Sequence, residues 1–428
     1  MPARSRRTAC STSRATTSCS PSRSRTGPPG TPADPGADGS ALIGSLSRSW
    51  RLPRGPSPFV RSGSGALSDL GAIARERGYL RALVTSDPGI AAAGITGRAR
   101  ESLESAGVLV EVFSDFAENP SESDVARAAE AAGAMRADSL VGVGGGSSLD
   151  VAKGAGFLLA GGGRMEDYRG YDKCPRPLPP LIGVPTTAGT GSEAQSYALI
   201  SRDRDHRKLA CGAPSAMFRD VILDPDLLPS APAEVIAATG FDSIAHAVET
   251  AVTSGRTDES VALSHRAFAL LSRAFPLVTA GDATPGAWED MQRGAFLAGA
   301  AIERSMLGAA HACANPLTRR FDVAHGRALA ITLPRVVRWN ASSAGEAYRD
   351  LLRAAGIAPG EDSADTLARR LDAWIVMAAL PRDFAGERLQ VRDLPALAEE
   401  ASTEWTGRFN PRPFDAAGAL AVYRSAVA

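Results

Sequence analysis

Between about Pro58 and Leu228, short apolar runs alternate with longer stretches in which apolar residues recur at helical spacing. The short runs are continuously apolar, which is typical of strands buried on both faces of a parallel sheet. This alternation predicts an α/β domain with helices on both faces of the sheet. The predicted strands are Arg81–Ser86, Val108–Phe113, Ser139–Val143 and Pro180–Val184, and the predicted helices are Ala92–Ala106, Glu122–Met135 and Leu149–Leu159.

After about Pro229 the pattern changes, and helical spacing continues without convincing strands between the helices. We therefore predict an α/β domain over residues 56–228 and an all-α domain over residues 229–428. The helices predicted in the second domain are Ala233–Ser254, Ser260–Ala274, Ala287–Ala301, Glu346–Ala355, Ala364–Ala378 and Leu394–Thr403.

Residues 1–55 lack hydrophobic periodicity and are rich in Ser, Arg, Pro and Gly, with nine arginines against two aspartates. Such a segment cannot bury enough apolar surface to offset the entropy of ordering it. Three explanations stay open: a disordered basic tail, a transit-type peptide, or residues added by an upstream start codon. The first and third are favoured.

Charge and cysteine usage narrow the class of protein. The 47 basic and 47 acidic residues balance, so nothing favours a nucleic acid or a membrane surface as partner. No apolar run reaches the ~20 residues of a membrane span. The five cysteines are scattered without CxxC spacing, which indicates a reducing, cytoplasmic setting. Lysine is rare in this arginine-rich chain, with only Lys153, Lys173 and Lys208.

Two glycine-containing loops follow predicted strands. The first, Gly144–Ser147, leads into a helix, an arrangement in which backbone N–H groups and the helix N-terminus suit a diphosphate. It matches neither GxGxxG nor a Walker loop, so a plain tight turn is the alternative. The second, Pro185–Glu193, contains three threonines, and an ordinary capped connection is its alternative. Both loops should lie at the carboxyl edge of the sheet, where ligands bind in open α/β folds.

Four residues of the helical half form a candidate metal site. Asp242 and His246 are spaced i, i+4 and so project from one helix face. His311 and His325 follow, and one carboxylate with three imidazoles suits Fe²⁺ or Zn²⁺. A local hydrogen-bonded Asp–His pair is the alternative, but three of the chain's five histidines lie in these two short segments.

Four segments resemble the iron-containing (type III) alcohol dehydrogenases, relatives of glycerol dehydrogenase and dehydroquinate synthase. They are GGGSSLDVAK (144–153), PTTAGTGSE (185–193), GFDSIAHAVE (240–249) and HACANPLTRRFDVAHG (311–326). The resemblance runs from about Pro58 to the end of the chain, including Asn410–Pro413. It implies a dehydroquinate synthase-like fold, in which a Rossmann-like dinucleotide-binding domain precedes a helical metal-binding domain.

The resemblance also implies roles for individual residues. Asp242, His246, His311 and His325 would be the metal ligands, with Fe²⁺ expected and Zn²⁺ as the alternative. Asp87 would lie near the adenine ribose, where a carboxylate favours NAD over NADP. Asp150 would shape the loop that holds the diphosphate. The other expected cofactor-binding residues are Asn119, Gly145, Gly146, Ser147, Thr186, Thr187, Thr190 and Lys208.

The chain departs from the family pattern at two places. Asn315 replaces a histidine found in many relatives, so a proton would have to leave through water, the cofactor ribose or another route. Thr318-Arg319-Arg320 replaces a stretch of small residues. One of these arginines would face an anionic substrate group, or both are simply solvated, which is favoured.

The sequence thus predicts a metal- and NAD(P)-dependent dehydrogenase or reductase of small alcohols or aldehydes, including ones that bear a carboxylate or phosphonate. The alternatives are a maleylacetate reductase-like or other keto-acid reductase, and a non-catalytic nucleotide-binding relative. The family also implies a homodimer or larger homo-oligomer.

Overall fold

The computed structural model describes residues 49–386 and 388–427. Most of the predicted basic tail therefore lies outside the described residues. Its last part does not: Ser49–Trp50 form strand β1, which pairs antiparallel with β2.

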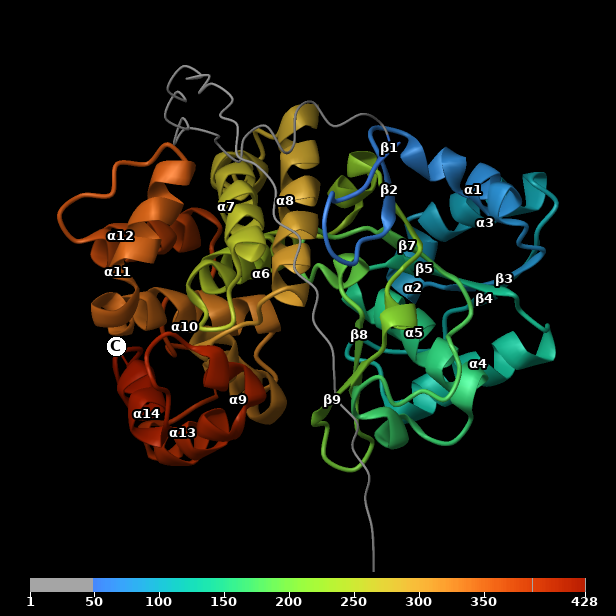
Figure 1. Cartoon of the computed structure of the whole chain (residues 1–428). Helices are drawn as coiled ribbons and strands as arrows, with labels where there is room; N and C mark the ends of the chain where they lie inside the picture. Colours follow the sequence, from blue (N-terminus) through green and yellow to red (C-terminus); the bar gives the residue numbers. More distant parts are fainter. Residues whose placement is uncertain (1–48, 387, 428) are drawn as a thin grey trace, which may run out of the picture. The chain divides into compact units, whose positions relative to one another are not determined.

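The main sheet has seven strands in the order β1-β2-β10-β7-β5-β3-β4, and all pairs except β1–β2 are parallel (Figure 1). The α/β class predicted from the apolar runs is therefore confirmed, with one antiparallel edge. Besides β1, the strands are β2 (Phe59–Ser62), β3 (Arg81–Thr85), β4 (Leu109–Phe113), β5 (Ser139–Gly144), β7 (Leu181–Pro185) and β10 (Asp220–Leu223).

Helices cover both faces of this sheet. Ala82 and Val84 of β3 pack in a core with α1 and α3, whereas Leu83 between them packs in the core that contains α4 and α5. The inner strands β3, β5 and β7 therefore bury both of their faces, which explains their largely apolar sequences, whereas the edge strand β4 leaves Leu109 and Glu111 exposed. These helices are α1 (Leu70–Arg77), α2 (Pro88–Ala92), α3 (Ile95–Ser105), α4 (Glu122–Ala134) and α5 (Gly146–Gly161).

A second, three-stranded sheet was not predicted. It has the order β6-β9-β8 and consists of β6 (Gly170–Tyr171), β8 (Tyr197–Ser201) and β9 (Lys208–Gly212). β8 and β9 form an antiparallel hairpin in which Ser201 pairs with Lys208.

From Ala233 onward the described residues form helices and short 3₁₀ turns, as predicted (yellow-green to red in Figure 1). The core of these helices is continuous with the α4–α5 face of the sheet. The helices are α6 (Ala233–Val252), α7 (Asp258–Thr279), α8 (Pro285–Glu303), α9 (Ala309–Phe321), α10 (His325–Trp339), α11 (Ala341–Ala354), α12 (Ser363–Met377), α13 (Leu394–Thr403) and α14 (Ala416–Arg424). Within residues 49–386 and 388–427, the 3₁₀ turns are η2 (Ala66–Asp69), η3 (Met165–Tyr168), η4 (Ser192–Ala194), η5 (Pro214–Ala216), η6 (Pro225–Ser230), η7 (Val391–Asp393) and η8 (Trp405–Phe409).

Several elements differ from the hydrophobic pattern. The helix expected over Ala92–Ala106 begins only at Ile95, as α3, because Gly94 before it adopts φ 77°. The short helix α2, which ends at Ala92, was not predicted. The pattern does not predict α9, α10 or α14. Pro316 and Pro334 lie inside α9 and α10, and interior prolines ordinarily argue against a helix.

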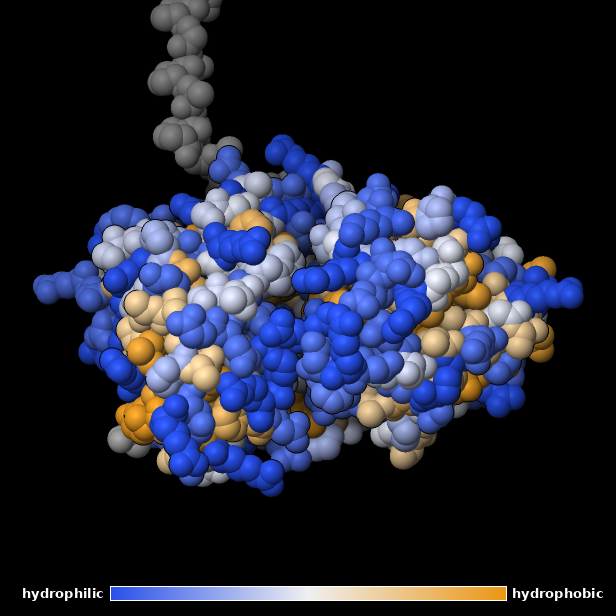
Figure 2. Space-filling view, turned by 90° about the horizontal axis from the view of Figure 1, so that it is seen from below, coloured by the Kyte–Doolittle hydropathy of each residue, from blue (hydrophilic) through white to orange (hydrophobic). Residues whose placement is uncertain are grey.

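Among the described helices, none is both long enough and apolar enough to cross a membrane. On the face shown in Figure 2, hydrophilic side chains predominate and apolar ones gather in small patches.

Candidate functional site

The loops after β3, β5 and β7 lie together at the carboxyl edge of the main sheet. β5 neighbours both β3 and β7, and Gly144 at its end is in register with Pro185. The amide of Thr186 donates to the carbonyl of Gly144 over 3.0 Å. The two glycine-containing loops therefore lie side by side, as their positions after parallel strands predicted.

The first loop leaves the N-terminus of α5 open to an anion. Gly145 is the N-cap residue of α5, and the first-turn N–H groups of a helix have no partner within it. Gly146 must remain small, since a Cβ there would lie 2.8 Å from Cγ2 of Thr190 in the second loop. The N-terminus of this 16-residue helix has no side-chain cap, and its charge and geometry suit a phosphate group.

Three of the predicted cofactor residues meet at this helix N-terminus. Asp87 accepts hydrogen bonds from Ser148 Oγ (3.2 Å) and from the amide of Ile90. The amide of Asn119 donates to Ser147 Oγ (3.3 Å).

The third residue is Lys208, whose Nζ donates to Oδ1 of Asn119 over 2.9 Å. Its side chain is exposed on the β8–β9 hairpin. Segments far apart in the sequence thus surround the start of α5.

Asp150 and Lys153 lie one turn further along α5 and tie it to the segment that follows the threonine loop. Asp150 accepts from Ser192 Oγ (2.7 Å) and from the amide of Leu199 (3.3 Å). Burial raises the pKa of Asp150, although Lys153 opposes this effect.

Lys153 was noted only for its rarity, yet it is fully buried. Its Nζ donates to the carbonyls of Ser192 (2.7 Å), Gln195 (2.7 Å) and Tyr197 (2.8 Å). Burial lowers the pKa of Lys153 to about 8, against the attraction of Asp150. The rarity of lysine in this arginine-rich chain was the sequence feature that could have indicated a special role for Lys153.

The threonine loop connects this edge to the helical half. Thr186 is buried and its Oγ1 has no hydrogen-bond partner among the described residues, whereas Thr190 Oγ1 accepts from the amide of Ser192. Thr187 is half-buried beside Gly145. Gly189 packs directly against Thr239 of α6, where a Cβ on the glycine would lie 2.7 Å from the threonine Cβ. Thr239 is one turn before Asp242, so the second loop reaches the candidate metal site.

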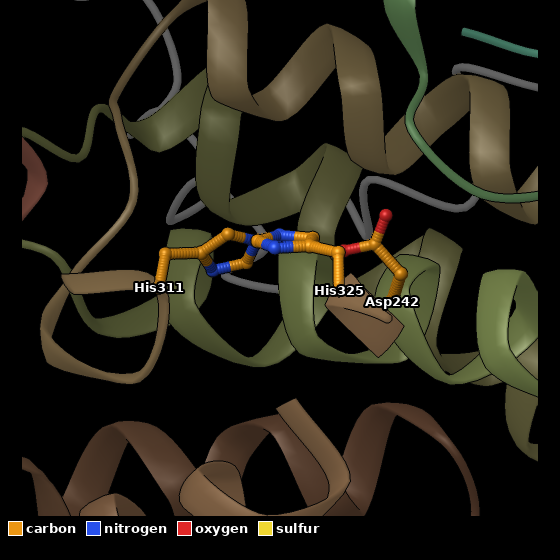
Figure 3. A group of neighbouring side chains, drawn as sticks. All are labelled: Asp242, His311 and His325. Carbon is orange, nitrogen blue, oxygen red and sulfur yellow. The ribbon is translucent and has the colours of Figure 1, made fainter. Parts of the chain in front are cut away.

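The four predicted metal ligands converge from α6, α9 and α10. Oδ1 of Asp242 lies 3.2 Å from Nε2 of His246, 3.5 Å from Nε2 of His311 and 3.9 Å from Nε2 of His325. The side chains of Asp242, His311 and His325 point toward one another (Figure 3), and their ligand atoms all lie within 4.8 Å. His246 joins this group through Asp242.

Close helix packing brings His325 to this position. It is the first residue of α10, and Gly326 after it lies against the backbone of α6 at Ala238. A Cβ on Gly326 would lie 2.0 Å from the carbonyl oxygen of Ala238, so only glycine allows this approach. The side chain of His325 is 37% exposed, against 5% for His246 and His311. The cluster therefore opens to solvent on the His325 side.

The charges and unpaired atoms of this cluster fit a divalent cation. Burial lowers the pKa of His246 to about 4, which leaves its imidazole neutral. Burial opposes ionisation of Asp242, but the neighbouring histidines hold its pKa well below the usual range. Oδ1 of Asp242 and Nε2 of His311 are buried without a hydrogen-bond partner among the described residues. Ligand atoms that face one another without donors are the arrangement that a metal ion satisfies.

Asn315 and the two arginines point elsewhere. Asn315 Nδ2 donates to Glu404 (3.1 Å), and Arg319 pairs with Glu404 (3.0 Å) and Glu400 (2.6 Å). Arg320 pairs with Glu400 as well, over 3.1 Å. Arg319 is part-buried between the two glutamates and so departs from the expectation of a solvated arginine, whereas Arg320 is exposed, as that favoured alternative expected.

Loops suited to a dinucleotide at the carboxyl edge of the sheet, beside a buried aspartate–histidine cluster, are the arrangement of a metal-dependent dehydrogenase. Residues 57–225 match the family described as iron-containing alcohol dehydrogenase, and residues 236–427 match the C-terminal part of the same family. The chain belongs to the iron-containing alcohol dehydrogenase family. It is accordingly an oxidoreductase of the alcohol dehydrogenase class, and iron and a nicotinamide dinucleotide are the cofactors of its family.

Individual relatives match this chain over most of their own length. The chain is 29% identical over 375 residues to lactaldehyde reductase of Escherichia coli strain K12, covering 86% of this chain and 97% of that protein. It is 33% identical over 353 residues to choline dehydrogenase of Bacillus subtilis strain 168, covering 81% and 86%. A crystal structure of 1,3-propanediol oxidoreductase superposes with a TM-score of 0.82 at 28% identity, covering 86% of this chain and 97% of that one.

Proposed function

We propose that this protein transfers a hydride between nicotinamide C4 and the carbonyl carbon of a small aldehyde, or the reverse from the alcohol. The observation that carries the proposal is the convergence of three imidazole Nε2 atoms on Oδ1 of Asp242, within 3.9 Å. Asp242, His246, His311 and His325 would hold Fe²⁺, with Zn²⁺ as the alternative. When bound, the ion supplies Lewis acidity at the substrate oxygen.

The sheet edge would hold the cofactor. The open N-terminus of α5, with Gly145, Gly146 and Ser147, would bind the diphosphate. Asp87 beside it would accept the ribose hydroxyls and repel a 2′-phosphate, which favours NAD over NADP. The remaining contacts would come from Asn119, Asp150, Thr186, Thr187, Thr190 and Lys208.

The contact between Gly189 and α6 supports placing the nicotinamide beside the metal cluster. The substrate would enter on the side of His325, whose ring is the most exposed of the three. Because an asparagine side chain does not titrate near neutral pH, Asn315 cannot exchange the alcohol proton. We propose that this proton leaves through water or the cofactor ribose.

We propose a short alcohol or aldehyde without an anionic group as substrate. The named relatives act on lactaldehyde, choline and 1,3-propanediol, all of them small hydroxyl or carbonyl compounds. The two arginines that would have favoured an anionic group are occupied by Glu400 and Glu404. An anionic substrate or keto acid would therefore need a different cation for recognition.

The test is a substrate screen with metal control. The protein is purified anaerobically with Fe²⁺, and in parallel with Zn²⁺, and cofactor oxidation is followed with short aldehydes, diols, choline and keto acids. We expect activity with a short aldehyde and NADH, loss of activity on chelation, and recovery when the metal is returned. Activity that survives complete metal removal would refute the proposal.

A pair of variants assigns the metal to its proposed ligands. His325→Ala should lower both metal content and activity at least tenfold, because it removes one ligand of four. His265→Ala is the matched control, since His265 is half-buried on α7 and takes no part in the cluster. Equal metal content in the two variants would contradict the assignment.

We further propose that the enzyme works in the cytoplasm as a homodimer or larger homo-oligomer. Among the described residues, Cys174, Cys211 and Cys313 are free thiols, which suits a reducing compartment. Light scattering after gel filtration tests the oligomeric state, and fractionation of the native cells tests the location.

A further inference from the structure

We propose that Glu249 is a positioning residue that fixes the tautomer of His311 and thereby sets the affinity of the metal site. Glu249 lies on α6, seven residues after Asp242 and three after His246, so the three side chains share one helix face. The inference rests on the proposed metal site and adds a residue that the family resemblance did not assign.

The contacts of Glu249 are short and directed. Its Oε2 lies 2.5 Å from Nδ1 of His311, and its Oε1 accepts from the amide of Ala310 over 2.7 Å. The side chain is only 4% exposed. Gly308 allows the start of α9 to approach, because a Cβ there would lie 2.9 Å from Oε1 of Glu249. The carboxylate of Glu249 therefore hydrogen-bonds to both a backbone amide and a histidine ring at the start of α9.

The hydrogen bond from His311 to Glu249 determines which ring nitrogen of His311 carries the proton. A carboxylate has no hydrogen to donate, so the bond at 2.5 Å requires a proton on Nδ1. The neutral ring then leaves the lone pair of Nε2 free, and Nε2 faces Oδ1 of Asp242 at 3.5 Å. Only this tautomer presents a metal ligand to the cluster.

Charge points the same way. The ion pairs described for Asp242 and Glu249 involve histidines only. Both carboxylates are buried beside the imidazoles, and their negative charges favour a divalent cation at this cluster. Glu249 would contribute one of these two charges through its contact with His311 Nδ1, without being a metal ligand.

Glu249→Gln separates tautomer control from simple packing. The amide of Ala310 still needs an acceptor, so the glutamine oxygen stays at that end and its NH₂ group faces Nδ1 of His311. The ring can then satisfy the NH₂ group only by moving its proton to Nε2, which blocks the ligand lone pair. We expect about 10- to 100-fold weaker binding of Zn²⁺, measured by competition with a chromophoric chelator.

Glu303→Gln is the matched control. Glu303 of α8 accepts from the amide of Ser196 (3.0 Å) and from its Oγ (2.7 Å). There a glutamine NH₂ group can donate to the hydroxyl, which also accepts, so Zn²⁺ affinity should stay within twofold of wild type. Equal affinity of Glu249→Gln and wild type would overturn the proposal, and so would equal losses in both variants.

A spectroscopic arm needs no variant. The chain has five histidines, so ¹⁵N-histidine NMR of the Zn²⁺-loaded protein resolves each ring. We expect an exchange-protected proton on Nδ1 of His311, and its absence would overturn the inference even if Glu249→Gln fails to fold. Wild-type protein that binds no metal would instead refute the proposed function, so the two failures are distinguishable.

Discussion

Lys153→Met removes a buried cation while keeping the length and apolar stem of the side chain. The carbonyls of Gln195 and Tyr197 lose the donor that Nζ supplies, whereas the carbonyl of Ser192 still accepts from the amide of Gln195 over 3.2 Å. Each unsatisfied buried acceptor costs about 1–3 kcal/mol. Methionine also removes the cost of burying a charge, which offsets part of the loss. Two such carbonyls would cost about 2–6 kcal/mol, and we expect the lower end of this range, about 2–3 kcal/mol of lost stability.

The assay is urea unfolding followed by circular dichroism, with the free energy taken from the first transition of this two-part chain. Lys173→Met is the matched control, because Lys173 is exposed, and its variant should change stability by less than about 0.5 kcal/mol. If both variants unfold at the same urea concentration, the bonds of Lys153 do not stabilise the fold and the reasoning is wrong.

A comparison of wild type with Lys153→Met at several pH values tests the charge of Lys153. Its pKa in the folded protein, about 8, lies below the ordinary value of 10.5. Between these values the unfolded chain holds the proton more tightly, so stability from this group rises with pH. Wild type should therefore gain unfolding free energy relative to Lys153→Met as the pH increases from about 8 towards 10.5. A constant difference over that range would contradict the lowered pKa.

Three further predictions concern the sheet edge and the second half. Gly146→Ala should weaken NAD binding at least tenfold by isothermal titration, because its Cβ would lie 2.8 Å from Thr190; unchanged affinity would show that the loops do not hold the diphosphate. Asp87→Ser should raise kcat/KM with NADPH relative to NADH by removing the carboxylate, and an unchanged ratio would exclude Asp87 from cofactor choice. Arg319→Ala should cost about 1–3 kcal/mol in urea, since this part-buried guanidinium bridges two carboxylates, whereas Arg353→Ala at an exposed pair should cost less than about 0.5 kcal/mol. Equal effects of the two arginine variants would mean that burial does not strengthen the bridge.

Local patterns in the sequence were sufficient to predict four strands of the main sheet and part of the site. Apolar runs predicted β3, β5 and β7, because a strand buried on both faces has no polar side, and the largely apolar run Val108–Phe113 predicted the edge strand β4. Helical spacing placed Asp242 and His246 on one face, and the glycine loops fell at strand ends as predicted. Short strands such as Phe59–Ser62 were not predicted, because four residues that include an arginine show too little periodicity.

The tertiary structure decided which distant side chains meet. His311 and His325 reach Asp242 only because α9 and α10 pack on α6, at a contact so close that Gly326 is required. Helix packing also brings Glu249 into contact with His311, and Glu400 into contact with Arg319. The residues of each pair lie more than sixty positions apart in the chain. Local sequence sets the shape of each helix and the face on which a side chain lies. The partner of that side chain depends on how the helices pack, which is a property of the whole core.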